Sequence, residues 1–317
     1  MTEAIVDTCV VRQAPFGEAL VDLGARRPDV VVLSADLGKY TDVAPFADAY
    51  PERFIQVGMA EANMMGIAGG LAKTGFLPFA VTYGVFATRR AYDQVAMALA
   101  TGPSRGVVVA FLPGITTPFR ATHQAIDDIA LMRALPGMTV IDPADATELA
   151  GAVDAAAAHD GPVYLRGLRG SVLQLFDPEK FRFRIGEPRV LVAGGEVGIV
   201  STGLGTQWAL EAAEHLEARG VRPSLLHVPT LKPVDGDAIA AFCAEFSAVT
   251  TVENHSVIGG LGAVLAGVLA ERGLPTRLRA LGVPDCWAPA GSLDYLRAQL
   301  GLDATAIANA VVDRVGE

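Results

Sequence analysis

The segment Phe54-Ile-Gln-Val-Gly-Met-Ala-Glu61-Ala-Asn-Met-Met-Gly-Ile-Ala-Gly-Gly-Leu71 decides the fold. Its apolar start, Phe54–Val57, has the pattern of a short strand, and the chain then turns at a glycine. A helix of small residues is predicted over Glu61–Lys73. A strand followed at once by a helix is the repeating unit of an α/β protein. Glu61 opens the predicted helix, where the positive end of the helix dipole favours an acid.

The same alternation of strands and helices continues on both sides of this segment. Apolar, β-branched runs predict strands, and apolar residues spaced by three and four predict helices. Because alternating strands and helices form parallel sheets covered on both faces, we expect an α/β protein with two doubly wound domains. The predicted strands are Val30–Ser34, Val107–Leu112, Thr139–Ile141, Val163–Leu165, Val197–Ser201, Ser224–Val228 and Ala248–Val252; the predicted helices are one after Pro15, one around Ala91–Leu99, and Ala144–His159, Gln207–Arg219, Asp235–Glu245 and Gly260–Arg272.

The segment Ser171–Pro188 interrupts this alternation. It mixes charge, aromatic residues, proline and glycine, which is typical of a linker that crosses a domain surface. We place the domain boundary near residue 185, which divides the chain into residues 1–185 and 186–317. A length of 317 residues agrees with two domains.

The composition excludes several classes of protein. Hydrophobic residues make up 51% of the chain and charged residues 19%, which excludes intrinsic disorder. The net charge is −10 without a basic run, so a nucleic-acid partner is not expected. No apolar run reaches the length of a membrane span, and no signal peptide pattern opens the chain, so we expect no membrane partner. Three scattered cysteines predict neither disulfides nor a zinc site, and a reducing cytoplasm is the expected location.

Further blocks follow the opening segment in a defined order. They are Thr82-Tyr-Gly-Val-Phe86-Ala-Thr-Arg-Arg-Ala-Tyr-Asp-Gln94, Ala121-Thr-His123-Gln-Ala-Ile-Asp-Asp-Ile-Ala-Leu-Met-Arg133, Asp142-Pro-Ala-Asp145-Ala-Thr-Glu148, Gly161-Pro-Val-Tyr-Leu-Arg166 and Val252-Glu-Asn-His-Ser-Val-Ile-Gly-Gly-Leu-Gly262. Together they resemble the C-terminal half of transketolase, over roughly residues 8 to 315. The resemblance is specific because several blocks agree in order and spacing. The subfamily resembled is the split transketolases, in which the two halves are separate chains.

This resemblance implies a pyrimidine-binding domain over residues 1–185, a transketolase C-terminal domain over 186–317, and thiamine diphosphate as cofactor. Glu61 matches the glutamate that hydrogen-bonds N1′ of the aminopyrimidine, and sharing that proton favours the imino tautomer from which the cofactor's carbanion forms. Phe86 matches the aromatic residue that stacks on the pyrimidine, Tyr83 a second aromatic beside it, and Asp36 an aspartate near the cofactor. The alternatives are ordinary core aromatics for Phe86 and Tyr83 and a strand-end turn residue for Asp36.

The resemblance also assigns residues to the substrate. His123 matches the histidine of a Thr-His-Gln block that lines the substrate channel, and a histidine can orient a hydroxyl or move a proton near neutral pH. Arg12 and Arg169 match positions that hold the substrate phosphate, for which a guanidinium is well shaped. Ordinary surface arginines are the alternative for both. Arg89, Arg90 and Arg166 are weaker candidates of the same kind.

The chain departs from the family pattern just before His123. Transketolases usually carry an acidic residue there that binds a sugar hydroxyl, whereas this chain has Gly114-Ile-Thr-Thr-Pro-Phe-Arg120-Ala-Thr-His. A histidine expected about twelve residues earlier is also replaced. We therefore expect a non-standard sugar or anionic substrate, with Arg120 as a residue that binds it.

The Gly-Asp-Gly motif that holds the cofactor's diphosphate and a divalent ion in this superfamily is absent. We expect no metal ligand in this chain. Mg²⁺, whose shell is built from phosphate and carboxylate oxygens, would be held by an N-terminal-half partner subunit. Two copies of each chain would form an α2β2 heterotetramer in which this chain also dimerises.

Other functions remain open at this stage. The β subunit of a 2-oxoacid dehydrogenase E1 shares both domains and the glutamate, but the Thr-His-Gln block favours transketolase. A 1-deoxyxylulose-5-phosphate synthase is normally one longer chain. A non-catalytic scaffold subunit would not need Glu61, Phe86 and His123. The partial dinucleotide motif Gly203-Leu-Gly-Thr-Gln-Trp208 lacks its third glycine and predicts only a tight strand–helix turn.

Overall fold

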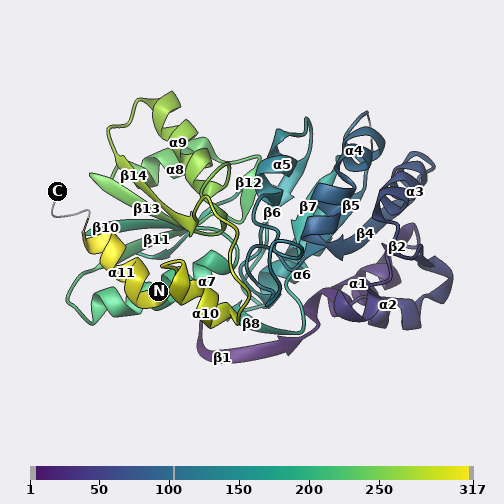
Figure 1. Ribbon diagram of the computed structural model, residues 1–317, viewed down its shortest axis with the longest axis horizontal. Helices are drawn as coiled ribbons and strands as arrows, with labels where there is room; N and C mark the ends of the chain where they lie inside the picture. Colours follow the sequence, from purple (N-terminus) through teal and green to yellow (C-terminus); the bar gives the residue numbers. More distant parts are fainter. Residues whose placement is uncertain (1–4, 103, 314–317) are drawn as a thin grey trace.

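The computed structural model describes residues 5–102 and 104–313 (Figure 1). Within those residues, none of the helices combines the length and the apolar character needed to cross a membrane. The elements of the first half are β1 (Ile5–Gln13), α1 (Pro15–Arg26), β2 (Val30–Ser34), η1 (Gly38–Tyr40), α2 (Ala44–Ala49), η2 (Pro51–Arg53), β3 (Phe54–Gln56), α3 (Glu61–Lys73), β4 (Leu77–Tyr83), η3 (Phe86–Arg90), α4 (Tyr92–Gln94), η4 (Val95–Leu99), β5 (Val107–Phe111), α5 (Asp128–Ala134), β6 (Thr139–Ile141), α6 (Ala146–Ala158), β7 (Val163–Arg166) and β8 (Ser171–Phe176).

The second half continues the alternation. Its elements are β9 (Arg189–Val192), β10 (Val197–Ser201), α7 (Leu204–Glu217), β11 (Pro223–His227), β12 (Thr230–Lys232), α8 (Gly236–Cys243), β13 (Ala248–Ser256), α9 (Leu261–Arg272), β14 (Arg277–Val283), α10 (Leu293–Gln299) and α11 (Ala304–Val312). The predicted bounds of β2, α3, β6 and β10 are confirmed without change.

A seven-stranded sheet lies at the centre of the first half, in the order β12-β6-β7-β5-β4-β2-β3. All neighbouring strands are parallel except β12, which runs antiparallel to β6. The strand β12 belongs to the second half of the chain, so both halves contribute to this sheet. Figure 1 shows the two halves side by side, with β12 and β6 between them.

Helices cover both faces of this sheet. Along β2, Val31 and Leu33 belong to the core cluster that also contains Met64 and Met65 of α3. Val30 and Val32 belong to a second cluster, on the other face, built with side chains of α1 and α6. Successive strand residues point to opposite faces, so a strand buried on both sides is apolar throughout. The predicted doubly wound arrangement is therefore confirmed for this half.

The second sheet has five strands in the order β14-β13-β10-β11-β9. Its neighbours are parallel except β9, which is antiparallel to β11. Its core includes Ile199 of β10, Leu225 of β11 and Trp208 of α7. The expectation of two α/β domains with mainly parallel sheets is therefore confirmed; the boundary near residue 185 stays a prediction.

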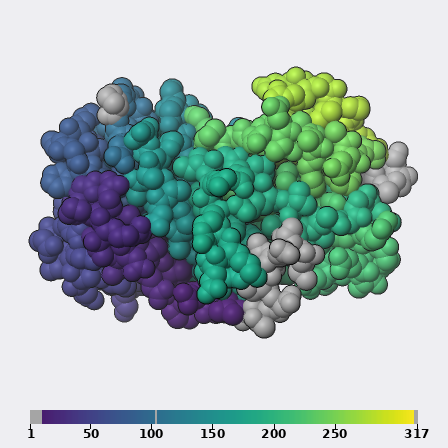
Figure 2. All heavy atoms as spheres, turned by 180° about the vertical axis from the view of Figure 1, so that it is seen from behind, coloured from purple at the N-terminus to yellow at the C-terminus, as the bar shows by residue number. Residues whose placement is uncertain are grey.

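The prediction of a linker over Ser171–Pro188 is wrong in its first part. Residues Ser171–Phe176 form β8, which pairs antiparallel with β1 in a two-stranded ribbon. Alternate residues Val172, Gln174 and Phe176 are buried, which is the period-two signature of a strand. In Figure 2 the purple N-terminal residues lie along the lower edge of the molecule, next to teal residues of the middle of the chain.

The predicted helix around Ala91–Leu99 is also not regular. The chain forms two π-helical segments, Phe86–Arg90 and Val95–Leu99, separated by one short α-helical turn. In the first of them the Thr88 hydroxyl donates a hydrogen bond to the Gly84 carbonyl at 2.7 Å. A π-helical turn accommodates an extra residue, and such turns are frequent at functional sites. This one follows directly after β4.

Four parallel strands of the first sheet end close together in the fold. They are β2 at Ser34, β3 at Gln56, β4 at Tyr83 and β5 at Phe111. The carboxyl ends of parallel strands share one edge of the sheet, and α/β proteins bind ligands outside that edge. Most of the predicted site residues follow these strand ends.

Candidate active site

Glu61 is the first residue of α3, and its side chain is only 2% exposed. Its two carboxylate oxygens each accept a hydrogen bond from Nη1 of Arg90, at 2.8 and 2.9 Å. The Arg90 side chain is 49% exposed, and its guanidinium lies 4.1 Å from the centre of the Phe86 ring. The buried carboxylate of Glu61 is thus paired with a half-exposed cation that also lies over the Phe86 ring.

Three rings gather beside this ion pair. Phe86 and Tyr83 are stacked, with centroids 5.7 Å apart and an interplanar angle of 30°. The His123 ring meets both edge-on, 5.6 Å from Phe86 and 6.0 Å from Tyr83. Phe119, which is 57% exposed, lies 4.9 Å from His123 on its other side. The structure therefore brings together four predicted residues, namely Glu61, Phe86, Tyr83 and His123.

The surroundings keep His123 neutral. Burial, and to a lesser degree the positive charge of Arg90, lower the pKa of His123 below its ordinary value of 6.5. Its Nδ1 lies 3.0 Å from the hydroxyl of Thr122. Burial also raises the pKa of Tyr83, so its phenol stays protonated. A neutral imidazole beside a flat aromatic surface and a carboxylate can orient a polar ligand and exchange a proton with it.

Asp36 has the conformation of a turn residue. It follows β2 with a positive φ of 60° and is exposed, and its backbone N–H donates a hydrogen bond to Oε1 of the Gln56 side chain at 2.7 Å. Asp36 lines a hollow of about 470 Å³ together with Tyr40 and Gln56. This geometry fits the alternative of a strand-end turn, and its role near a cofactor stays a prediction.

The structure separates the two arginines predicted to hold a phosphate. Arg169 donates from Nη1 to the Tyr40 carbonyl at 2.7 Å and lines a hollow of about 420 Å³ that also contains Gln207 of the second half. Arg12 lines a different hollow of about 740 Å³, with Arg182. The two guanidinium groups therefore do not form one basic cluster around one of these hollows, and a phosphate role for each stays a prediction.

Arg120 is exposed and belongs to the same turn as His123. Its carbonyl accepts hydrogen bonds from the backbone N–H groups of His123 at 2.9 Å and Gln124 at 3.3 Å. Any movement of this turn therefore moves both side chains.

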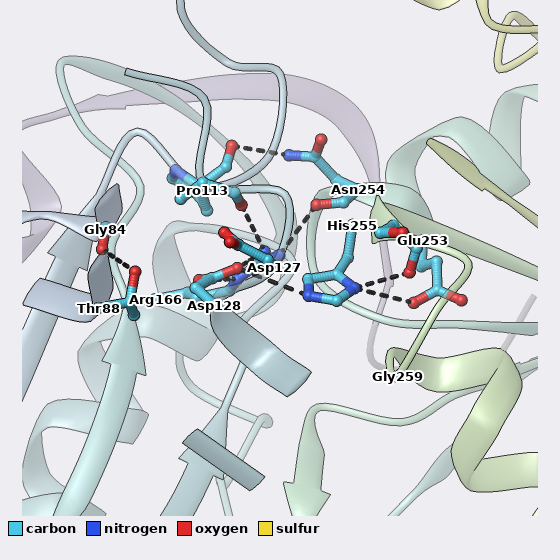
Figure 3. A network of polar contacts seen from close by, with 12 residues as sticks. Gly84, Thr88, Pro113, Asp127, Asp128, Arg166, Glu253, Asn254, His255 and Gly259 are labelled. Atoms are coloured by element: carbon cyan, nitrogen blue, oxygen red, sulfur yellow. Dashed lines mark hydrogen bonds and ion pairs between the residues drawn. The ribbon is translucent and has the colours of Figure 1, made fainter. Parts of the chain in front are cut away.

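Arg166 lies in a buried network between the two halves and also donates to the Ala125 carbonyl, two residues after His123, at 3.3 Å (Figure 3). Its side chain is 1% exposed and pairs with Asp128, through Nη2 to Oδ1 at 2.5 Å, and with Asp142 at 3.3 Å. It also donates to the Asn254 carbonyl at 3.1 Å. As a buried arginine held by two carboxylates, it joins the halves, and the suggestion that it binds a phosphate is wrong.

The same network holds a histidine and a glutamate of the second half. Nε2 of His255 lies 3.9 Å from Asp128, and burial lowers the pKa of His255 to about 4. The Glu253 carboxylate accepts hydrogen bonds from the N–H groups of Leu261 and Gly262, which begin α9. These residues lie in the predicted Val252–Gly262 block and fix α9 rather than reach the rings.

No sequence pattern indicates Arg90 as the partner of Glu61, because the two residues lie 29 positions apart. Phe119 was not predicted either, although it directly precedes Arg120. Phe86 and Arg90 are the first and last residues of η3, four positions apart, a spacing that places side chains on one face of a helical turn.

The comparisons with known proteins agree with this geometry. Residues 10–173 match the pyrimidine-binding domain of transketolase, and residues 186–307 match the transketolase C-terminal domain. The chain belongs to the transketolase family. This transketolase-family chain is 46% identical over 298 residues to a putative uncharacterized transketolase family protein of Sinorhizobium fredii, covering 93% of this chain and 86% of the relative.

Two further similarities concern separate chains of comparable length. A 6-deoxy-6-sulfo-D-fructose transketolase subunit of Clostridium sp. strain MSTE9 is 40% identical over 296 residues, which cover 93% of this chain and 91% of the relative. A solved structure of a split-gene transketolase, described as an inactive β4 tetramer, superposes with a TM-score of 0.87 at 40% identity. The superposition covers 97% of this chain and 99% of the chain in that structure.

Proposed function

We propose that this chain is the C-terminal-half subunit of a split transketolase-like enzyme, which transfers a two-carbon ketol unit with thiamine diphosphate. The observation that supports it is the buried carboxylate of Glu61 beside the stacked rings of Phe86 and Tyr83, with His123 against both. Thiamine diphosphate, when bound, supplies the carbanion that carries the two-carbon unit. The residues of this chain bind, orient and exchange protons.

The residues present fit the aminopyrimidine half of this cofactor. The Glu61 carboxylate can accept a hydrogen bond from a ring nitrogen, and the Phe86 ring offers an aromatic face beside it. Arg90 now occupies both carboxylate oxygens, and it is half exposed and able to move aside. Tyr83 and Asp36 are assigned to the same cofactor by the family resemblance alone.

The diphosphate and Mg²⁺ are proposed to be held by a partner. Among residues 5–102 and 104–313, no cluster of three or more His, Cys, Asp or Glu side chains is arranged to bind a metal ion. We propose that an N-terminal-half subunit supplies that site, in an α2β2 heterotetramer in which this chain also contacts its own copy. The relatives described as a transketolase subunit and a split-gene β4 tetramer support this proposal. We also propose a cytoplasmic location and a boundary near residue 185.

The proposed substrate is a ketose that carries an anionic group. Arg120 stands where transketolases usually carry an acid, and its side chain is exposed beside Phe119. The relative that bears the name of a sulfo-fructose transketolase subunit supports a sulfonate or phosphate at that end of the sugar. Arg169 and Arg12 remain further candidates for that anion, each from its own hollow.

One reconstitution tests the proposal. The full chain is mixed with a candidate N-terminal-half partner, thiamine diphosphate and Mg²⁺, and both cofactor binding and transfer of a two-carbon unit from ketose donors are measured. The proposal expects binding and turnover only when both chains are present. A complex that binds cofactor without turnover would support the scaffold alternative. A complex that decarboxylates a 2-oxoacid would support the dehydrogenase-subunit alternative. If that decarboxylation also requires an aldehyde phosphate as acceptor, it would support the 1-deoxyxylulose-5-phosphate synthase alternative.

A further inference from the structure

Arg89 makes the densest set of hydrogen bonds near the candidate site, although it touches neither Glu61 nor the rings. It lies in η3, three residues after Phe86. Its Nε and Nη2 donate to the carboxylate of Asp127 at 2.8–3.1 Å. Its Nη1 donates to the Ala121 carbonyl at 2.7 Å, and Nη2 also donates to the Gln124 carbonyl at 3.0 Å. One guanidinium thus holds both sides of the turn that carries His123.

The remainder of that loop is attached to the second half of the chain. The Ile126 carbonyl accepts a hydrogen bond from the Ser256 N–H at 2.8 Å, and the Gln124 side chain donates to the Pro289 carbonyl at 3.2 Å. The Arg89 guanidinium also lies 4.9 Å from the centre of the Trp287 ring. Arg89 therefore connects the π-helical turn bearing Phe86 to the loop bearing His123 through hydrogen bonds, beside the direct contact of the Phe86 and His123 rings.

The adjacent residues Asp127 and Asp128 pair with two different arginines. Asp128 pairs with Arg166 in the buried network, where both side chains are at most 1% exposed. Asp127 pairs with Arg89 near the surface, where the side chains are 38% and 27% exposed. The buried pair lies between the two halves, and Arg166 also donates to the Ala125 carbonyl of the loop at 3.3 Å, whereas the outer pair holds the two ends of the loop from the surface. Loss of Arg89 should therefore loosen the loop without unfolding the chain.

We propose that Arg89 is a positioning residue that holds the Ala121–Asp127 loop, and with it His123, at a set place against Phe86. It acts through hydrogen bonds to main-chain carbonyls and one carboxylate, not through contact with a substrate. A guanidinium presents five N–H donors on three separate nitrogens and can reach acceptors on different sides, whereas the three donors of a lysine ammonium sit on one nitrogen. The consequence for catalysis rests on the proposed function; the order of the loop does not.

Trypsin gives a direct measure of the loop, because the exposed Arg120 directly precedes it and the cleaved bond is Arg120–Ala121. The variants are Arg89→Gln and Arg89→Lys in the full chain, and mass spectrometry follows the rate of cleavage after Arg120. We expect both variants to be cleaved about tenfold faster than the parent chain, since proteolysis follows the population of the open loop. The matched control is Arg272→Gln, which removes an exposed arginine that donates twice to Asp237 far from the loop.

Cleavage after Arg120 at the parent rate in both Arg89 variants would overturn the proposal. Cleavage of Arg89→Lys alone at the parent rate would also overturn it, because it would indicate a purely electrostatic role. If Arg89→Gln does not fold, Asp127→Asn tests the same contact from the other side and should raise cleavage as well. In an active complex, both Arg89 variants should lower kcat more than they raise KM. A complex without turnover would refute the proposed function, while the cleavage result would still decide the role of Arg89.

Discussion

Glu61 and Arg90 form an ion pair of unequal burial: the carboxylate is 2% exposed, and the guanidinium that pairs with both of its oxygens is 49% exposed. A carboxylate withdrawn from water is costly unless it is paired or hydrogen-bonded. The pair therefore supplies Glu61 with two hydrogen bonds from a cation that lies over the Phe86 ring. Each carboxylate oxygen accepts one bond from Arg90 and keeps a further lone pair, so a ligand can hydrogen-bond Glu61 beside the arginine or in its place.

Removal of Arg90 should destabilise the chain mainly through the carboxylate that it leaves behind. We expect Arg90→Gln to lower the free energy of unfolding by about 1–2 kcal/mol. The double variant Arg90→Gln/Glu61→Gln should recover most of that loss, because neither charge is then left unpaired. Urea unfolding of the four chains measures the coupling. Additive losses in the double variant would show that the ion pair is not the cause.

Glu61→Gln should abolish most of the activity of the reconstituted enzyme and leave the chain folded. A carboxylate that takes part in proton exchange contributes about 10²–10⁴-fold to the rate. We expect kcat/KM to fall within that range, while the thermal unfolding temperature and assembly with the partner change little. Glu217→Gln, at the exposed end of α7, is the control and should retain full activity. A Glu61→Gln enzyme with normal kcat/KM would remove Glu61 from the mechanism.

The titration of His123 should depend on Arg90. Burial and the charge of Arg90 hold the pKa of His123 below 6.5, so loss of that charge should raise it. Because folding lowers the pKa of His123, its contribution to the free energy of unfolding is fully present above the unfolded-state pKa of 6.5. That contribution is lost as the pH falls through the lower folded-state pKa. NMR titration of the imidazole signals, with His123→Gln for assignment, should show an upward shift in Arg90→Gln and none in Arg272→Gln. An unchanged pKa in Arg90→Gln would contradict this electrostatic picture.

Arg166→Met should be among the most damaging substitutions in the chain. It leaves the carboxylates of Asp128 and Asp142 buried without their cation, which costs about 3–5 kcal/mol. Denaturant unfolding should show this loss, compared with less than about 0.5 kcal/mol for the surface control Arg272→Gln. A small effect of Arg166→Met would mean that the network between the halves contributes little to stability.

Arg120→Ala should affect anionic substrates selectively. If the guanidinium binds a phosphate or sulfonate, its loss should raise KM for such ketoses about tenfold and leave uncharged substrates unaffected, because one charge-assisted contact is removed. A panel of donors and acceptors with and without the anionic group measures this difference. Equal efficiencies of the variant and the parent enzyme on every substrate would exclude Arg120 as the residue that binds the anion.

The alternation of strands and helices was predictable because it depends on local periodicity. The pattern of β2 and α3 follows from the burial of both faces of a strand and one face of a helix, which neighbouring residues encode. The strand β4 is not predicted from the sequence, where Pro78 interrupts its apolar run and a proline argues against a central strand. The sequence of β8 indicates a linker because its partner β1 lies about 160 residues earlier, and the pairing of these two strands accompanies the burial of its alternate residues.

The sequence by itself determined the α/β class, the place of Glu61 at the start of a helix, and the aromatic and histidine residues that the family resemblance assigns to the site. The tertiary structure decided which cation faces which carboxylate. It paired Arg90 with Glu61, gave Asp127 to Arg89 and Asp128 to Arg166, and separated Arg12 from Arg169. Charges carry no periodic signal of their partners, because an ion pair needs only that two side chains end within a few ångströms after distant elements have packed.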